Sequence, residues 1–171
     1  MKPCLFTLLA LASSMLGLSC INPFAPKLDF NLQAQLCNDL TNIDNVLCTF
    51  RNAYAFKDTT LYGSIIASDF TFLYRDYDKG VDVFWGRDED IRTTFGLFQS
   101  IQRLDLVWNT VISSTMTPDS LDATIIRNFN LTVTFSANDI VRVEGYANWT
   151  LKRTVTSDVW KIIRWRDESN F

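Results

Sequence analysis

From about residue 103 onward, the chain is a succession of long segments in which apolar and polar residues alternate. A period of two, as in Phe129, Leu131 and Val133, is typical of a strand with one buried face and one exposed face. Turns that contain Pro, Asn, Asp or Ser separate the segments and predict antiparallel neighbours. Four strands are expected, over residues 103–113, 121–136, 140–154 and 159–166. Their apolar side needs other elements to cover it.

Two helices are predicted at the start of the folded part. Apolar residues recur at the spacing of one helix face from about residue 39 to 54, so one side of this helix is expected to be buried. A short second helix follows, with Asp58 or Thr59 as its N-terminal cap. The residues that form the buried face of the first helix are Ile43, Val46, Leu47, Phe50, Ala53 and Tyr54.

A hairpin and a third helix lie between these helices and the long strands. Alternation over residues 70–75 and a short apolar run at 81–85 predict two paired strands. The third helix opens at Gly86, and the acidic residues at 88–90 suit its first turn because the helix dipole favours negative charge there. We assign the apolar side of this helix to Ile91, Phe95 and Phe98.

This order of elements predicts an α+β domain over residues 39–171. The chain has thirteen Phe, five Trp and five Tyr, and one strongly curved sheet is the simplest way to bury so many aromatic side chains. We therefore expect a conical fold, in which one strongly curved, mainly antiparallel sheet wraps around three N-terminal helices. A length of 171 residues allows one such domain together with a leader.

The first residues have the composition of a secretory leader. One positive charge at Lys2 precedes an apolar run, and small residues approach Cys20. The ending of this segment resembles a bacterial lipobox, which implies a signal peptide over residues 1–19, lipidation of Cys20 and a tether over 20–38. We expect the protein in the bacterial cell envelope, as an outer-membrane lipoprotein that faces the periplasm. The alternative is cleavage and release, as a secreted or periplasmic protein.

Cys37 and Cys48 are the two cysteines that remain outside the leader and the lipid site. An oxidising compartment permits a disulfide between them. Eleven residues on one helix would separate them by roughly 16 Å, however, which is far beyond the reach of a disulfide. We therefore expect two separate thiols.

The chain contains no His, which excludes Ser-His-Asp and Cys-His sites as well as His-ligated metals. Any catalysis would have to use Asp, Glu, Tyr, Lys, Arg or Cys. With 16 basic and 19 acidic residues the net charge is −3, and we expect no nucleic acid as a partner. We also expect no metal site and no cofactor.

The order of elements resembles the nuclear transport factor two-like superfamily, whose conical α+β fold is shared by ketosteroid isomerases and SnoaL-like proteins. In ketosteroid isomerases a Tyr donates to the substrate oxyanion and an Asp moves the proton. The matching positions here hold Phe50 and Tyr74, so the resemblance implies no steroid-isomerase activity. The segments that carry the resemblance are Phe50 to Asp58, Tyr62 to Phe70, Gly86 to Ile91 and Trp160 to Trp165.

Seven residues are candidates for a pocket inside the cone. Aromatic walls with a few polar tips are typical of small-molecule sites, although the same rings would also serve as ordinary core. Arg127 interrupts an apolar strand face. It either projects into the cone, where it would bind an anionic ligand, or pairs with an acid at the rim. The candidates are Phe50, Tyr54, Phe72, Tyr74, Trp85, Trp108 and Arg127.

We expect a membrane-anchored periplasmic lipoprotein whose domain binds a small molecule or a protein and performs no chemistry. The alternatives are an isomerase, dehydratase or hydrolase with a nonstandard Asp, Tyr or Arg site, and a structural accessory of an envelope complex. The expected partners are the membrane, through the N-terminal lipid, a small apolar or anionic ligand, and a second copy of the chain against the sheet face. An open cavity would favour a ligand, and a buried carboxylate with a strongly raised pKa inside it would favour an enzyme.

Overall fold

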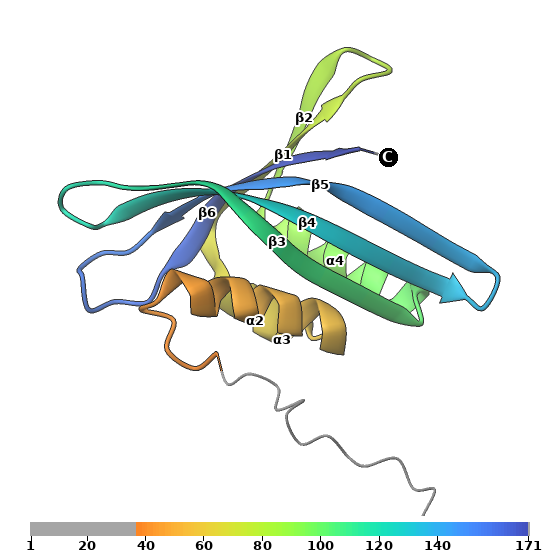
Figure 1. Cartoon of the computed structure of the whole chain (residues 1–171), viewed down its shortest axis with the longest axis horizontal. Coiled ribbons are helices and arrows are strands. Elements are labelled where there is room, and N and C mark those ends of the chain that lie inside the picture. Colours follow the sequence, from red (N-terminus) through yellow and green to blue (C-terminus); the bar gives the residue numbers. More distant parts are fainter. Residues whose placement is uncertain (1–36, 171) are drawn as a thin grey trace, which may run out of the picture. The chain divides into compact units, whose positions relative to one another are not determined.

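The computed structural model describes residues 37–170, in which three helices and six strands follow one another (Figure 1). The elements are α2 (Ile43–Phe56), α3 (Thr59–Ile65), β1 (Ile66–Asp76), β2 (Val81–Gly86), α4 (Arg87–Ser100), β3 (Arg103–Met116), β4 (Asp122–Ser136), β5 (Asp139–Lys152) and β6 (Lys161–Asn170). This is the predicted order: two helices, a hairpin, a third helix and four long strands.

The six strands form one sheet with the order β2-β1-β6-β5-β4-β3. All neighbouring strands run antiparallel except β1 and β6, which are parallel. The register between β3 and β4 shifts at Trp108–Val111 and again at Val111–Ser113. Such irregularities increase the local twist and bend a strand, and the long strands arch over the helices (Figure 1). The predicted α+β fold of one curved, mainly antiparallel sheet with three helices is confirmed.

Side-chain caps determine where the first two helices begin. Asn42 precedes α2, and its side chain accepts a hydrogen bond from the backbone N–H of Asp44 at 2.8 Å. Asp58 precedes α3 and accepts from the N–H of Leu61 at 2.9 Å. Between the helices, Lys57 adopts a left-handed backbone conformation with φ of 55° that ends α2. The chain therefore turns sharply, and α3 packs beside α2.

The core lies between the concave side of the sheet and the helices. Phe50 is at its centre, with 1% of its surface exposed. Its ring stacks on Tyr54 of the same helix at 4.6 Å between centroids, and it contacts Trp149 of β5 at 4.8 Å and Trp165 of β6 at 5.3 Å. Helix α2 is therefore held against the centre of the sheet by aromatic contacts.

Helix α4 presents a different side to the core from the one that the sequence predicts. Its buried residues are Asp90, Thr94 and Phe98, whereas Phe95 is 52% exposed and Ile91 is half-buried. The prediction was right for Phe98 and wrong for Phe95, because it chose the most apolar set of positions at helix spacing. The set that faces the core includes a carboxylate and a hydroxyl, which suggests that the space beneath this helix is not ordinary core.

Cys37 and Cys48 form a disulfide, so the prediction of two separate thiols was wrong. That prediction placed both residues on one helix, but α2 begins only at Ile43. Cys37 lies before the helix, in a segment that returns along it, and the Cα atoms of the two cysteines are 5.8 Å apart. The Thr49 hydroxyl also donates to the backbone oxygen of Cys37 at 3.3 Å, which holds this segment against α2.

The signal peptide, the lipidation site Cys20 and most of the tether lie outside the described residues. The last two tether residues, 37 and 38, are described, and the disulfide attaches them to the domain. Among the helices of residues 37–170, none is both long and apolar enough to cross a membrane.

Candidate functional site

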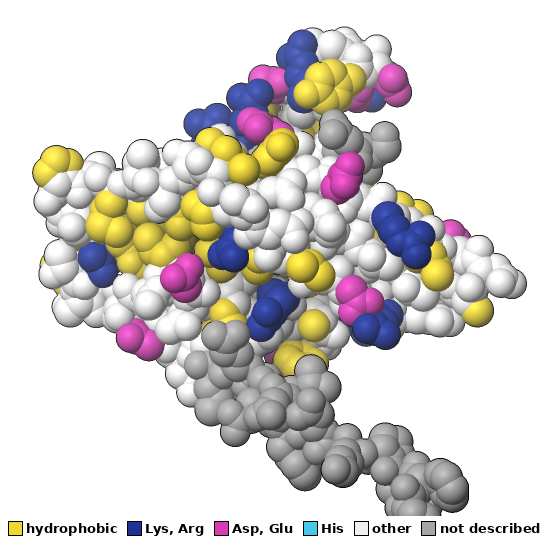
Figure 2. Space-filling model, viewed as in Figure 1, with side chains coloured by type: hydrophobic (Ala, Val, Ile, Leu, Met, Phe, Trp, Pro, Cys, Tyr) yellow, Lys and Arg dark blue, Asp and Glu magenta, His cyan; other side chains and the backbone are white. Residues whose placement is uncertain are grey.

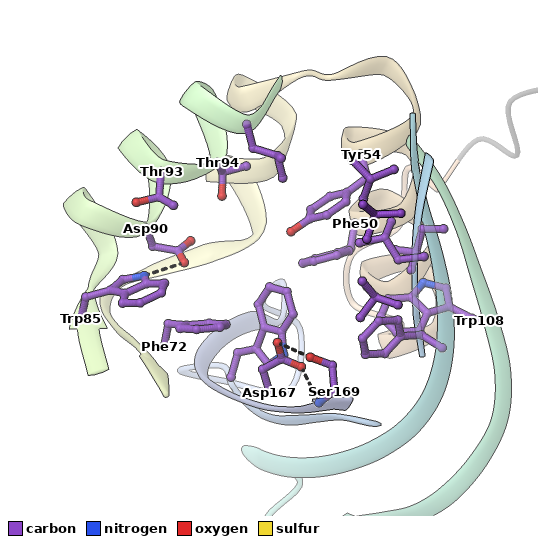
Figure 3. A pocket seen from close by; sticks show the side chains of 18 of the residues that line it. Phe50, Tyr54, Phe72, Trp85, Asp90, Thr93, Thr94, Trp108, Asp167 and Ser169 are labelled. Carbon is purple, nitrogen blue, oxygen red and sulfur yellow. Dashed lines mark hydrogen bonds between the residues drawn. The ribbon is translucent and has the colours of Figure 1, made fainter. Parts of the chain in front are cut away.

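A cavity of about 420 Å³ opens between α2, α4 and the concave side of the sheet (Figure 3). Aromatic and aliphatic side chains form most of its wall, and the polar groups come from α4 and β6. The apolar lining residues are Phe50, Tyr54, Phe72, Trp85, Leu97, Leu106, Trp108, Phe129, Leu131, Val133, Phe135, Val141, Val143 and Trp165. The polar ones are Asp90, Thr93, Thr94, Asp167 and Ser169.

Five of the seven pocket candidates lie around this one cavity: Phe50, Tyr54, Phe72, Trp85 and Trp108. They come from α2, β1, β2 and β3, so the fold brings together residues that are far apart in the chain. Trp108 is fixed by a hydrogen bond from its Nε1 to the backbone oxygen of Leu47 at 2.9 Å. Trp85 is stacked on Phe72 at 4.5 Å between ring centroids.

Tyr74 and Arg127 are not among the residues that line the cavity. The Tyr74 ring packs against that of Trp85, which does line the cavity, at 5.8 Å between centroids. Arg127 borders a separate cleft together with Asp44 and Arg51 of α2, and its Nε donates to the backbone oxygen of Asn109 at 3.0 Å. The cavity therefore lacks the cation that an anionic ligand would need.

Asp90 is a buried carboxylate in the wall of the cavity, only 3% exposed. One oxygen accepts a hydrogen bond from Trp85 Nε1 at 3.0 Å (Figure 3). The other oxygen accepts from the Tyr62 hydroxyl at 2.6 Å. Burial raises the pKa of Asp90 above its ordinary value, and these two donors oppose that shift because they stabilise the charged form.

Asp167 is a second carboxylate in the same wall, contributed by β6. It accepts hydrogen bonds from the backbone N–H of Ser169 at 3.1 Å and from the Ser169 hydroxyl at 3.0 Å (Figure 3). Burial raises the pKa of Asp167 as well, and the nearby charge of Glu168 acts in the same direction. Both carboxylates thus lie where water solvates them poorly.

The Tyr54 hydroxyl lies close enough to both carboxylates to be affected by their charge. Burial is the largest cause that raises the pKa of Tyr54, and the negative charges of Asp90 and Asp167 raise it further. The hydroxyl points into the cavity from α2, opposite α4 (Figure 3). The site therefore combines a phenol and two carboxylates inside an aromatic enclosure.

The negative charge of the cavity is a local feature of the molecule. On the face in Figure 2, basic and acidic side chains are interspersed over the surface. The ion pairs of the described region, such as Arg75 with Asp82, are on the surface and include neither cavity carboxylate. Lys and Arg are likewise missing from the lining. Residues 37–170 hold no cluster of three or more His, Cys, Asp or Glu side chains that could ligate a metal ion.

Sequence reasoning missed Asp90 and Asp167, although a signal for each exists. Trp165, Asp167 and Ser169 alternate at period two, so a strand predicted to continue beyond residue 166 would have placed the carboxylate on the inner face. Asp90, Thr94 and Phe98 follow one another at the spacing of one helix face. The predicted face of this helix, Ile91, Phe95 and Phe98, shares only Phe98 with that set.

Comparison with solved structures finds the same fold at low sequence identity. A conserved protein from Planctomyces limnophilus superposes with a TM-score of 0.64 at 16% identity, covering 75% of this chain and 93% of that chain. A protein of the NTF2-like family from Streptomyces avermitilis gives 0.61 at 15%, covering 78% and 96%. An uncharacterized protein with a cystatin-like fold from Caulobacter vibrioides gives 0.58 at 13%, covering 75% and 87%.

No model of a protein family and no curated protein matches the chain. The structural likenesses therefore establish the fold, and an activity cannot be transferred from them because one fold serves many functions. The fold-level part of the resemblance drawn from the sequence is confirmed: the chain has the cystatin-like cone fold of the NTF2-like proteins.

Proposed function

We propose that the domain binds a small, largely apolar organic molecule in the cavity between α2, α4 and the sheet. The cavity itself is the observation that carries this proposal. Its volume of about 420 Å³ lies in the range of small-molecule sites, and its wall is apolar except for a few polar groups on α4 and β6. Protein cores contain few voids larger than a water molecule, so a space of this size is not ordinary packing.

Titration calorimetry with naphthylethanol, a neutral bicyclic alcohol, tests whether the cavity binds a small, largely apolar molecule. We expect saturable binding to the wild-type protein. Leu131→Trp fills the space from β4, and it should weaken binding by about tenfold or more, which corresponds to ~1.4 kcal/mol. Asn130→Trp is the matched control, because it adds the same ring to an exposed neighbour on the same strand. Equal binding by both variants would reject the cavity as the site.

Acid–base catalysis is a second candidate function, favoured by the Asp167 carboxylate in the cavity wall and its raised pKa. Buried carboxylates with raised pKa values are suited to proton transfer near neutral pH. The probe is α-tetralone, a bicyclic ketone, whose deuterium uptake next to the carbonyl is followed by NMR in heavy water. Exchange by the wild type that Asp167→Asn abolishes without loss of binding would support this function. Exchange no faster than in buffer would reject it for this substrate class.

The cell envelope is the proposed location, with the protein anchored by a lipid on Cys20. The Cys37–Cys48 disulfide supports an oxidising compartment such as the periplasm. Cys20→Ala should abolish acyl labelling and move the protein out of the membrane fraction, because acyl chains contribute roughly 0.8 kcal/mol of membrane affinity per buried methylene. Unchanged labelling and fractionation of this variant would exclude the anchor, whereas the binding proposal would remain.

A further inference from the structure

We infer that the ligand of this cavity is a hydrophobic organic cation, an amine or quaternary ammonium group on an apolar body. The inference rests on the proposed function and narrows it to a class of ligand. Its basis is the combination of two carboxylates and several aromatic faces around one cavity whose lining residues include no Lys or Arg.

The charge of the two carboxylates is the first step of the argument. Buried carboxylates in proteins are normally paired with a cation or a metal. Among the described residues, neither Asp90 nor Asp167 takes part in an ion pair. The groups that affect their pKa values are neutral donors or other acids. A positive charge that enters the cavity would therefore complete a pairing that the chain itself leaves open.

The hydrogen bonds of the two carboxylates orient them without neutralising them. Asp90 accepts from Tyr62 and Trp85, and Asp167 accepts twice from Ser169. An ionised carboxylate has about four acceptor positions, so each keeps capacity for a further donor. An ammonium group supplies up to three N–H donors together with its positive charge. It can therefore fill the free acceptor positions and also neutralise the carboxylates.

The aromatic walls supply the second element of cation recognition. The face of an indole or phenyl ring attracts a cation within about 6 Å of its centroid, and Trp is the most effective ring. Trp85 lies beside Asp90, to which it donates, and its ring stacks on Phe72. Trp108, Trp165 and Phe50 also line the cavity. The apolar body of the ligand would contact these rings while its charged end reaches α4 or β6.

An anionic ligand, which was one sequence-based expectation, is disfavoured by the same geometry. Arg127 was the residue expected to attract it, and Arg127 borders a different cleft. An anion in the cavity would face two carboxylates of like charge in a poorly solvated space, where repulsion between charges is strong. Discrimination by charge is therefore the property to measure.

Three probes with one bicyclic body and different head charges test the inference: naphthylethylamine, naphthylethanol and naphthylacetate. At neutral pH they are a cation, a neutral molecule and an anion. We expect the amine to bind the wild type about tenfold or more tightly than the alcohol, and the acetate to bind most weakly. Asp167→Asn and Asp90→Asn should each reduce the amine-to-alcohol ratio. Glu89→Gln, which removes one charge from an exposed residue of α4 that does not line the cavity, should leave the ratio unchanged.

The outcomes separate this inference from the proposed function. Binding of the alcohol as tight as that of the amine would overturn the inference and leave the proposed function intact. A preference for the amine that persists in both Asp→Asn variants would also overturn it, because the carboxylates would not be its cause. Binding of none of the three probes would overturn the proposed function and the inference together.

Discussion

The Trp85 indole donates a hydrogen bond from Nε1 to one oxygen of Asp90 at 3.0 Å, while the Tyr62 hydroxyl donates to the other oxygen at 2.6 Å. These two bonds connect β2 and α3 to the first turn of α4. Asp90 is therefore both a part of the cavity wall and a joint between three elements. Two substitutions of Asp90, one that removes its hydrogen bonds and one that removes only its charge, separate the structural role of the side chain from the role of the charge.

Asp90→Leu should destabilise the fold by about 3 kcal/mol, because it leaves the donors of Tyr62 and Trp85 without an acceptor. Asp90→Asn should stay within about 1 kcal/mol of the wild type. Its amide oxygen can accept from Trp85, and its amide nitrogen can donate to the Tyr62 hydroxyl, which rotates to accept. Urea unfolding measures both differences. If the Leu variant is as stable as the Asn variant, these bonds do not hold α4 in place.

The pH dependence of stability should report the half-buried carboxylate of Asp167. Because its folded-state pKa is raised above the ordinary aspartate value of 3.8, the folded chain binds more protons than the unfolded chain between these two pKa values. The wild type should therefore gain stability relative to Asp167→Asn as the pH falls from neutral toward 3.8. Urea unfolding across this window measures the difference, with Glu89→Gln as a control for the same change in net charge at an exposed position. A difference that does not vary with pH would contradict the burial of this carboxylate.

The fold could be predicted from the sequence because its signals are local. The alternation in β4 and β5 and the helix spacing around Phe50 specify which faces are buried. The same parity puts Phe72 and Trp108 on the inner face of the sheet, where both line the cavity. Tyr74 obeys the same parity and was therefore chosen too, although it lies further along β1 and does not line the cavity. Local periodicity gives the face of a residue but not its depth in the cone.

The chemistry of the site could not be predicted in the same way, because it depends on contacts between distant residues. Asp90 is held by Tyr62, which is 28 residues away in the chain. An acidic residue in the first turn of a helix is well explained by the helix dipole alone, so the spacing of Asp90 with Thr94 and Phe98 did not by itself indicate a cavity. The disulfide was missed for a related reason: the spacing of its cysteines does not reveal that the chain reverses direction before α2.

Gly145→Ala should disrupt the pairing of β5 and β6. Gly145 lies opposite Ser169, and a Cβ atom at position 145 would stand 2.3 Å from the Ser169 Cα and 2.8 Å from the backbone oxygen of Glu168. The strands must move apart, at a cost of about 1–3 kcal/mol or more. Because Ser169 also orients Asp167, binding of naphthylethylamine should weaken as well.

The control for this substitution is Gly96→Ala on α4. Position 96 is exposed, and apart from its chain neighbours and the backbone of its own helix no atom lies within 4 Å of a Cβ added there. Ala in a helix interior is favoured over Gly by about 0.5–1 kcal/mol, so this variant should be slightly more stable than the wild type. Urea unfolding compares the two variants. A Gly145→Ala protein as stable as Gly96→Ala would show that β5 and β6 are not paired at this position.

Removal of the disulfide should destabilise the domain by about 3 kcal/mol, the chain-entropy value for a closed loop of this size. The bridge joins cysteines that are eleven residues apart, and it holds the segment before α2 against the helix that carries Phe50 and Tyr54. The Cys37→Ala, Cys48→Ala double variant is compared with the wild type by urea unfolding, with and without dithiothreitol. The reductant should destabilise the wild type and leave the double variant unchanged. Alkylation of both thiols in the untreated, purified wild-type protein would show instead that the bridge does not form.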